Sequence, residues 1–553
     1  MRQKFIITLV AVTSILGCTS TQPSNQSNPA ISSPTPNIEN IKGHMNFLAD
    51  DLLEGRDTGS RGAELAALYI ASEFKKYGLT PGAGNDSFFQ RVTFRKALLV
   101  QESPSLTFSG EQTLALDYPS DYIVGPSAAR VDSKVNAELV FVGYGIVAPE
   151  FEHNDYADLD VEDKVVVMLS GKPASFPSEE GAHVASGSQK SKYAVERGAI
   201  GIITLQTPAG EKVRPYQTSL NYIHTPRMRW IGEDGIPGNV HPEIQASAYL
   251  SMPTAKKLFE NAGKDLEQVY AQLENDEVPV GFELPVTMEL SYQSTHEDLT
   301  SPNVAGVLPG SDPELADEFV VFTAHYDHIG ISKSVEKDRI NNGAMDNATG
   351  TSVLMETARM FSTLAEAPKR SILFLAVTGE EKGLLGADYY AQNPSVEGEM
   401  VANVNLDMPL LTYESADVIA FGAAHSTMGK SVENAVANAG ISLSPDPWPE
   451  LNLFTRSDHY AFVKQGIPAV FLVTGIESKT PGIEGDKVLS NFLKTNYHRP
   501  SDDLSQAFVW PAAKTFAQVN FEIGLELAQQ EARPAWYKES FFGKTFGKVF
   551  VQE

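Results

Sequence analysis

The sequence predicts an α/β fold in which a mostly parallel, mixed sheet is flanked by helices. Two observations after residue 301 support this expectation. Short apolar runs alternate with longer amphipathic segments, and polar residues follow directly where several of the runs end. Hydrophobic runs this short, separated by helices, are typical of strands that are buried on both faces of a sheet. In such sheets, ligands bind beyond the carboxyl ends of the strands.

The expected elements of this part of the chain can be placed by residue range. The expected strands are 318–325, 370–377, 402–408, 416–422 and 468–473. The expected helices are 348–364, 382–393, 426–440 and 510–530, and two more are expected near the start of the folded chain, at 38–55 and 62–79. Each helix shows apolar residues at helical spacing.

Residues 130–290 have a different texture and are expected to form an inserted, β-rich domain. The runs "AELVFVGYGIVAP" and "KVVVMLSG" read as strands with glycine turns, and "SKYAVERGAIGIITL" reads as a helix followed by a buried strand. The catalytic domain would then comprise residues 38–129 and 291–553. A chain of 553 residues is long enough for two or more domains.

Composition narrows the function classes. The net charge is −27 and the pI is about 4.8, so we exclude nucleic acid and anionic lipid as partners on electrostatic grounds.

The N-terminus indicates export. Residues 1–18 combine a basic start with an apolar run that is too short to span a bilayer, as in a secretory signal peptide. The run ends "ILGC" at Cys18, the only cysteine in the sequence, and this resembles a bacterial lipobox. Residues 19–37 read as a disordered linker. Thr19 rather than aspartate follows the cysteine, and the resemblance to lipoproteins then implies the outer membrane, facing the periplasm or the cell surface. Lipid on Cys18 would be the only membrane contact.

Acidic and imidazole side chains follow three of the expected strands. His325 and Asp327 lie at the end of the first strand, Glu380 and Glu381 after the second, and Asp407 after the third. A histidine and an aspartate two residues apart lie on one face of an extended strand, where the carboxylate can orient the imidazole. Taken alone, the pair is more typical of a protein surface than of a metal site.

Two further candidates lie outside these strand ends. Asp346 precedes a helix in "NNGAMDNATG", where it would also suit an N-cap, and His498 occurs in "YHRPSDD". We place His328 in a turn with no role. So many carboxylates can come together only with cations between them, and mixed carboxylate and imidazole ligands suit zinc, with other divalent ions possible.

The motifs "AHYDH", "MDNATG", "TGEEKGLLG", "NLDM" and "YHRPSDD" together resemble the M28 family of co-catalytic zinc peptidases, over about residues 38–530. The inserted region resembles a protease-associated (PA) domain in "VFVGYG", "KVVVM" and "AVERGAIGIITL". The family implies a zinc-exopeptidase fold of the phosphorylase/hydrolase-like type. It also implies a cis peptide after Asp346.

The resemblance also implies a role for each site residue. Asp346 would bridge two Zn²⁺ ions, His325 and Asp407 would complete one site, and Glu381 and His498 the other. Asp327 would support His325.

Glu380 would be the general base that removes a proton from a water activated by the two ions. Exchange of roles between Glu380 and Glu381 stays open. For "RSDHYAF", which carries Arg456, Asp458 and His459, we expect a structural role rather than a part in the pocket.

The expected function is a metal-dependent aminopeptidase that removes N-terminal residues from peptides. Three alternatives remain: an M28-type carboxypeptidase, a single-zinc enzyme similar to glutaminyl cyclase, and a receptor-like relative without catalysis. The preferred N-terminal residue, the role of the inserted domain and the oligomeric state stay open.

Overall fold

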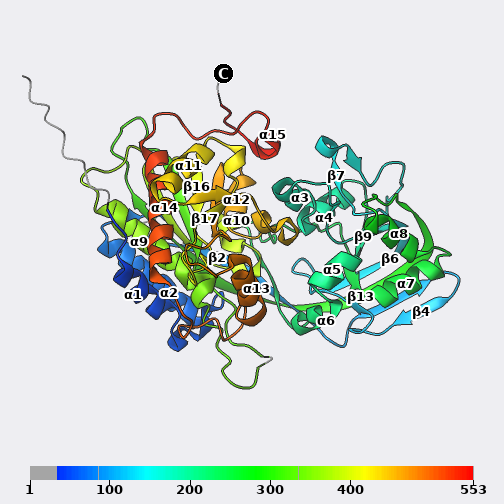
Figure 1. Cartoon of the computed structure of the whole chain (residues 1–553). Coiled ribbons are helices and arrows are strands. Elements are labelled where there is room, and N and C mark those ends of the chain that lie inside the picture. Colours follow the sequence, from blue (N-terminus) through cyan, green and yellow to red (C-terminus); the bar gives the residue numbers. More distant parts are fainter. Residues whose placement is uncertain (1–33, 85, 334, 552–553) are drawn as a thin grey trace, which may run out of the picture.

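The computed structural model describes residues 34–551, apart from residues 85 and 334. The expected signal peptide with Cys18 lies outside the described residues, as does the expected linker up to residue 33. The described chain forms two lobes (Figure 1), joined by one 27-residue strand, β13 (Phe282–Leu308), which takes part in the sheets of both. Among residues 34–551, no helix combines the length and the apolar character needed to cross a membrane.

The first lobe contains the mixed sheet that the sequence predicts. Its strand order runs β2, β13, β15, β14, β16, β19, β17, β18, and β14, β15, β16 and β19 are mutually parallel. The α/β fold class is therefore confirmed. The strands are β1 (Thr80–Pro81), β2 (Phe89–Leu99), β14 (Glu318–His325), β15 (Ser371–Val377), β16 (Glu399–Asn405), β17 (Asp417–Phe421), β18 (Ser442–Ser444) and β19 (Ala469–Thr474).

Helices cover both faces of this sheet, as side-chain alternation along the central strands requires. In β15, Phe374 faces one hydrophobic cluster, whereas its neighbours Leu373 and Leu375 face another. The first face is covered by α1 (Ile38–Leu48), α2 (Arg61–Lys76), α9 (Thr349–Ser362), α11 (Met428–Asn438), α13 (Gly485–Thr495) and α14 (Trp510–Gln529). The second is covered by α10 (Leu385–Gln392) and α12 (His459–Val463).

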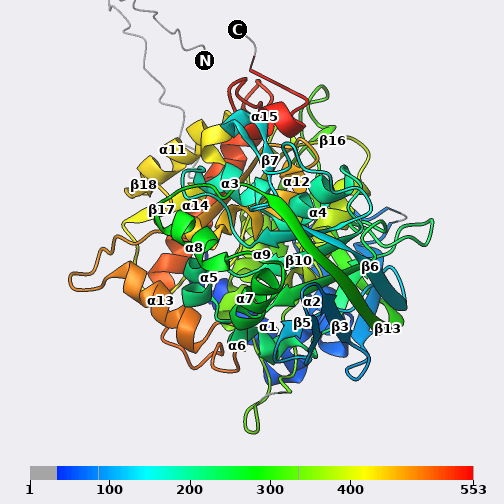
Figure 2. The ribbon, with the colours of Figure 1, turned by 90° about the vertical axis from the view of Figure 1, so that its right-hand side faces the viewer.

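The second lobe contains a sheet in the order β4, β3, β13, β6, β9, β10, β12, β5. Figure 2 shows this lobe facing the viewer, with β13 running across it. The strands are β3 (Ser105–Ser109), β4 (Thr113–Leu116), β5 (Tyr122–Ile123), β6 (Asp132–Phe141), β9 (Val165–Leu169), β10 (Gly201–Leu205) and β12 (Ala246–Leu250).

Helices pack on this sheet from both sides. One hydrophobic cluster joins it to α7 (Met252–Asn261) and α8 (Leu266–Glu274), and another to α4 (Gly187–Val195). The remaining elements of the lobe are α3 (Ser178–Val184), α5 (Pro208–Val213), α6 (Tyr216–Ser219) and the separate pair β7 (Val147–Ala148) and β8 (His153–Asn154).

The border between the lobes does not follow the expected range 130–290. The second sheet already includes β3, β4 and β5, which precede residue 130. Conversely, β11 (Arg227–Trp230) lies inside the expected insert but pairs antiparallel with β2, at the edge of the first sheet. Because β11 adds to the first sheet, the inserted segment supplies side chains close to the ends of the central strands.

A buried arginine ties together the loops at this end of the first sheet. Arg56 is the last residue of the short 3₁₀ turn η1 (Asp51–Arg56), and it is only 1% exposed. Its guanidinium donates to the backbone carbonyls of Tyr326 at 2.8 Å and Gly343 at 3.0 Å, and also to those of Asn342 and Leu48. One side chain therefore satisfies carbonyls from three separate segments of the chain.

Replacing Arg56 by methionine is expected to lower the free energy of unfolding by about 3 kcal/mol or more, because it leaves several buried carbonyls without donors. Urea denaturation followed by circular dichroism measures this change. The matched control is Arg95→Met, which removes an arginine whose ion pair with Asp298 lies at the surface; we expect a cost under about 1 kcal/mol. Equal effects of the two substitutions would contradict the structural role of Arg56.

Candidate metal centre

The carboxyl ends of three adjacent parallel strands carry the predicted ligands. His325 is the last residue of β14, Glu380 and Glu381 begin the 3₁₀ turn η5 (Glu380–Lys382) after β15, and Asp407 follows β16 by two residues. Because β14 lies between β15 and β16, these side chains meet at one edge of the sheet. The expectation that they converge is confirmed.

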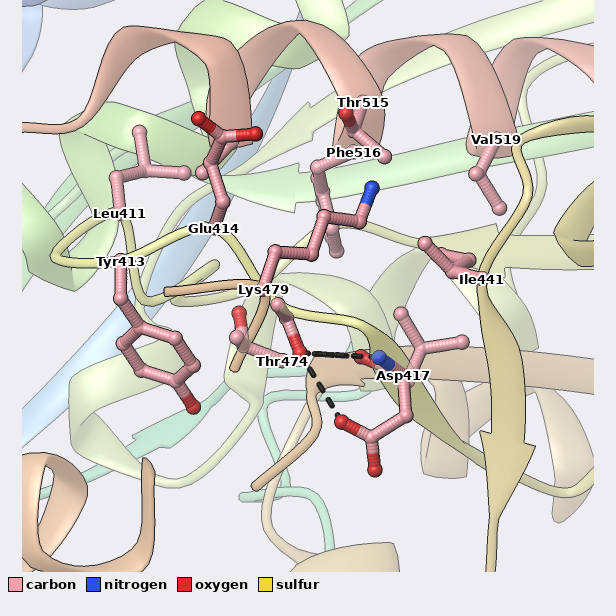
Figure 3. A pocket seen from close by; sticks show the side chains of 13 residues that line it. Leu411, Tyr413, Glu414, Asp417, Ile441, Thr474, Lys479, Thr515, Phe516 and Val519 are labelled. Atoms are coloured by element: carbon pink, nitrogen blue, oxygen red, sulfur yellow. Dashed lines mark hydrogen bonds between the residues drawn. The ribbon is translucent and has the colours of Figure 1, made fainter. Parts of the chain in front are cut away.

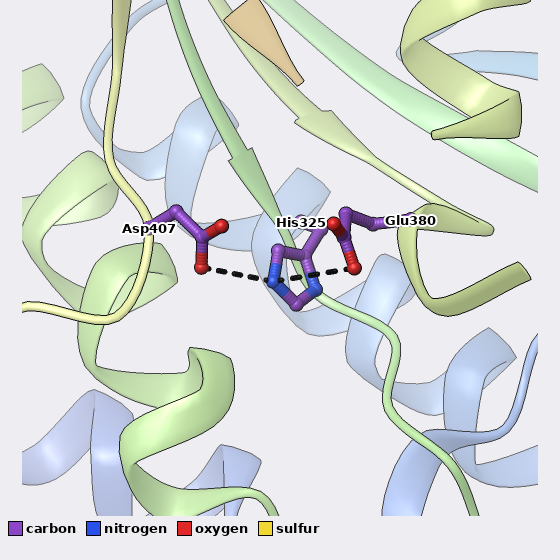
Figure 4. A group of neighbouring side chains, drawn as sticks. All are labelled: His325, Glu380 and Asp407. Atoms are coloured by element: carbon purple, nitrogen blue, oxygen red, sulfur yellow. Dashed lines mark hydrogen bonds and ion pairs between the residues drawn. The ribbon is translucent and has the colours of Figure 1, made fainter. Parts of the chain in front are cut away.

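The first group of possible ligands consists of His325, Glu380 and Asp407 (Figure 4). The Nε2 atom of His325 lies 3.1 Å from Oδ1 of Asp407 and 3.9 Å from Oε2 of Glu380. The same Nε2 atom lies 3.4 Å from Oδ1 of Asp346. Asp346 and Asp407, the predicted co-ligands of His325, therefore lie beside it. Glu380, predicted as the base and not as a ligand, also lies near it.

The second group contains Asp346 and Glu381 with two histidines. Nε2 of His498 lies 3.1 Å from Oε2 of Glu381 and 3.3 Å from Oδ2 of Asp346. On the other side, Nδ1 of His328 lies 2.6 Å from Oε1 of Glu381 and 4.0 Å from Oδ2 of Asp346. The sequence analysis gave His328 no role; the structure instead groups it with Asp346 and Glu381 as possible ligands.

Asp346 occupies the position between the two groups. One of its carboxylate oxygens faces His325 and the other faces His498. It lies in the short π-helical turn η4 (Ala344–Ala348), and the peptide bond between Asp346 and Asn347 is cis, as the family resemblance implied. This is the placement expected of a carboxylate that bridges two ions.

Backbone hydrogen bonds fix the turn that carries Asp346. The carboxylate of Asp502 accepts from the backbone N–H groups of Met345 at 2.9 Å and Asp346 at 3.1 Å. The backbone carbonyl of Asp502 in turn accepts from Ala344. Asp502 belongs to the same motif as His498, so one loop supplies a possible ligand and holds the turn opposite it.

Asp327 acts differently from the expectation. His325 Nδ1 lies 3.2 Å from the backbone carbonyl of Asp327 and 3.9 Å from its carboxylate. The carboxylate instead accepts from the backbone N–H of Glu380 at 3.2 Å and from the Thr58 hydroxyl at 3.0 Å. Asp327 therefore positions the turn that carries Glu380.

A chain of polar contacts orients Asp407. Ser457 donates to Oδ2 of Asp407 at 2.6 Å, Asn405 donates to the Ser457 hydroxyl at 2.7 Å, and Thr323 donates to Asn405 at 2.6 Å. All four residues are buried. The sequence analysis did not find Ser457 or Asp502, because their contacts join segments that are remote in sequence.

Asp458 and His459 follow Ser457 and are fully buried. Within the part of the chain that the structure describes, neither carboxylate oxygen of Asp458 has a hydrogen-bond partner, and Asp458 makes no side-chain cap on α12. His459 packs between Phe454 and Phe471. The structural role expected for this segment therefore fits His459, whereas the unpartnered Asp458 faces the charges of His325 and Asp407.

Burial and mutual repulsion shift the pKa values of this cluster strongly. Burial, together with the charges of Glu381 and Asp407, raises the pKa of Glu380 well above its usual range. Burial also raises the pKa of Asp458 to about 8. Glu381 behaves in the opposite way, because His498 and His328 outweigh its burial and hold its pKa well below the usual range. The histidine charges therefore stabilise the ionised form of Glu381, whereas the ionised form of Glu380 is unfavourable without further positive charge.

The residues present fit a pair of divalent cations. Nε2 of His498 lies close to two carboxylate oxygens but makes no hydrogen bond with either. A cation shared by these atoms would satisfy all three, and would also relieve the repulsion among the carboxylates. Mixed imidazole and carboxylate donors in two adjoining groups suit zinc.

A cleft leads from this centre along β11. Its walls include Glu381 and Lys382 from the first lobe, and Arg227, Met228 and Tyr222 from the inserted segment. A different, narrow cavity lies between β17 and α14, lined by Tyr413, Asp417, Phe516 and others (Figure 3). It contains none of the possible ligands.

Comparisons with known proteins agree with this geometry. Residues 303–523 match the model of peptidase family M28, a range that holds all seven residues predicted for the site. Among curated proteins, the chain is 30% identical over 212 residues to aminopeptidase YwaD of Bacillus subtilis, covering 37% of this chain and 40% of that protein. It is 22% identical over 457 residues to transferrin receptor protein 1 of Gallus gallus, covering 78% of this chain and 54% of that protein. The chain thus spans about half or less of the length of these relatives.

One solved structure resembles the fold over nearly all of its length. An aminopeptidase from Aneurinibacillus sp. strain AM-1 superposes with a TM-score of 0.52 at 19% identity, covering 90% of this chain and 96% of that chain. At that identity the likeness establishes the shared fold.

We expect metal analysis of the purified protein to find two divalent ions per chain. Asp346→Asn removes a charge that faces both histidines, so its metal content should fall below one ion per chain after dialysis. Plasma mass spectrometry measures both values. The control is Glu314→Gln, which removes an exposed carboxylate and should leave the content unchanged. Full metal content in Asp346→Asn would contradict the bridging role.

Proposed function

We propose that this chain is a metal-dependent aminopeptidase of peptidase family M28, whose model matches residues 303–523. The observation that carries the proposal is the convergence of His325, Asp346, Glu381, Asp407 and His498 at one edge of the sheet. Two Zn²⁺ ions held there would polarise a peptide carbonyl and lower the pKa of a water molecule.

Glu380 is the residue that we assign as general base. Asp327 fixes its backbone N–H, and its carboxylate accepts no hydrogen bond from another side chain of the described residues. Glu380 would take a proton from the attacking water and return it to the departing amine. Its neighbour Glu381 contacts His328 and His498, so the structure favours Glu381, rather than Glu380, as the ligand of the second ion.

Residues around the metal centre hold the catalytic side chains in position. Asp327, Asp502 and Ser457 hold the segments of Glu380, Asp346 and Asp407 in place. Such positioning matters because a small displacement of a catalytic group costs much of the rate.

Three alternative functions are supported less well than an aminopeptidase. The relative named as a transferrin receptor keeps a non-catalytic role open, but the complete set of possible ligands favours catalysis. Two groups of ligands favour a two-ion enzyme over a single-zinc one of the glutaminyl cyclase type. A carboxypeptidase would use the same metal centre, so only the substrates that are cleaved distinguish it from an aminopeptidase.

The second lobe and the N-terminus add finer proposals. We propose that the second lobe is a PA domain, supported by "VFVGYG", "KVVVM" and "AVERGAIGIITL". We also propose that the protein is exported and anchored by lipid on Cys18, supported by the basic and apolar residues that precede it. Cys18→Ser should then move the protein from the detergent phase to the aqueous phase in a Triton X-114 partition.

Glu380→Gln is expected to keep both metal ions and to lower kcat by a factor on the order of 10³. The measurement combines metal analysis with hydrolysis of amino-acid p-nitroanilides. Glu381→Gln is the matched control on the adjacent residue, and we expect it to lose metal as well as activity. Loss of metal in Glu380→Gln instead would reverse the roles of the two glutamates.

A substrate panel tests the proposed activity itself. We expect hydrolysis of aminoacyl substrates with a free α-amino group and none of the N-acetylated ones. Cleavage confined to N-blocked peptides with a free C-terminal carboxylate would establish the carboxypeptidase instead.

A further inference from the structure

A cation-lined cavity opens from the cleft into the second lobe. Its volume is about 580 Å³, and it lies between β10, β12 and β11. Gly125, Arg227 and Arg229 line both this cavity and the cleft that reaches Glu381. The two spaces therefore adjoin at these residues, on the side toward which a peptide would leave the metal centre along the cleft.

Three cations line the cavity: Arg227, Arg229 and Lys190. No aspartate or glutamate is among its lining residues. The Nε of Arg229 is buried and has no hydrogen-bond partner among the described residues. In a chain with a net charge of −27, a cavity lined by basic residues and no acidic ones indicates selection for a negatively charged ligand.

The charge of Asp388 acts on Arg229, but the Asp388 carboxylate already has other partners. Its Oδ2 accepts from Trp230, Asn239 and Gln392, and its Oδ1 pairs with Lys464 at 2.7 Å. Asp388 thereby fastens β11 to α10 and leaves the arginines without a neutralising partner.

The pKa values of Arg229 and Lys190 also favour the binding of an anion in this cavity. Burial, reinforced by the charge of Arg227, lowers the pKa of Arg229 to about 10. Burial also lowers the pKa of Lys190 to about 7, although its ammonium group donates to the backbone carbonyls of Leu169 and Gly171. A bound carboxylate would offset the cost of holding these charges away from water.

The local structure places both arginines on a strand at the edge of the first sheet. Arg227 and Arg229 are two residues apart on β11, so their side chains leave the same face of the strand. β11 pairs with β2 of the first sheet. At Gly125, a Cβ would lie 2.6 Å from the guanidinium of Arg227, so the backbone there leaves room for the cation.

We propose that Arg227 and Arg229, with Lys190 deeper in the cavity, form a subsite for a carboxylate on the C-terminal side of the bond that is cleaved. The inference rests on the proposed aminopeptidase function: the α-amino end lies at the metal centre, and the rest of the peptide follows the cleft. Its substrates are then short peptides whose terminal carboxylate reaches the arginines, or peptides with an acidic side chain at that position.

The test compares peptide acids with peptide amides. Leu-Gly-Gly and its homologues of two to six residues are assayed as free acids and as C-terminal amides, and Leu-Gly-Glu-amide separates a side-chain carboxylate from a terminal one. We expect kcat/KM to favour the acid at least tenfold at one length, mainly through KM, as a charge-assisted hydrogen bond predicts. Preference for Leu-Gly-Glu-amide over Leu-Gly-Gly-amide would support the subsite through the side chain.

Arg229→Gln and Arg227→Gln are each expected to bring the acid-to-amide ratio within about twofold of one. The ratio is used because any general loss of activity cancels from it. Arg227 is exposed, so its substitution tests the subsite even if Arg229→Gln folds poorly. Arg227→Lys should retain part of the preference.

Lys96→Gln is the control, because Lys96 lies opposite Met228 in the same strand pair but does not line the cavity; it should keep the wild-type ratio. Two results would overturn the inference alone. The first is equal wild-type rates for acids and amides at every length together with no preference for Leu-Gly-Glu-amide over Leu-Gly-Gly-amide, and the second is a wild-type preference that neither arginine substitution changes. A wild-type protein with two bound ions that hydrolyses no aminoacyl substrate would overturn the proposed function, and the inference with it.

Discussion

The repulsion among carboxylates buried at one edge of the sheet is the constraint on which the rest of this structure depends. Asp346, Glu380, Glu381 and Asp407 lie within a few ångströms of two histidines. Buried like charges are unfavourable unless positive charge lies between them. Holding the carboxylates together therefore lowers the stability of the folded protein, and bound divalent cations would restore it. Metal binding and the stability of this region are expected to be linked.

The loops around the centre show how that arrangement is maintained. Asp502 holds the turn of Asp346, Asp327 holds the turn of Glu380, and Ser457 holds Asp407. Arg56 anchors the segments on either side by their backbone carbonyls. The ligands are thus fixed by a layer of hydrogen bonds, and this layer draws on residues from Arg56 to Asp502.

The sequence predicted the part of the site that depends on local pattern. The strand at 318–325 matches β14, and the apolar runs at 370–377 and 402–408 overlap β15 and β16, so the residues that follow them could be placed at one edge of the sheet. What the sequence did not reveal depends on contacts between distant segments. His328 looked like an ordinary turn residue, yet it meets Glu381 because the turns after β14 and β15 lie side by side.

The same limit applies to the inserted segment. Its strands could be recognised as β-like, but no local signal showed that β11 would leave its own sheet and pair with β2. The length of β13 explains how this pairing arises, because one strand lies in both sheets and fixes one lobe against the other. The inserted segment is therefore part of the first sheet as well as of its own lobe. It places Arg227 and Arg229 in the cleft that Glu381 also lines, which is the arrangement behind the proposed carboxylate subsite.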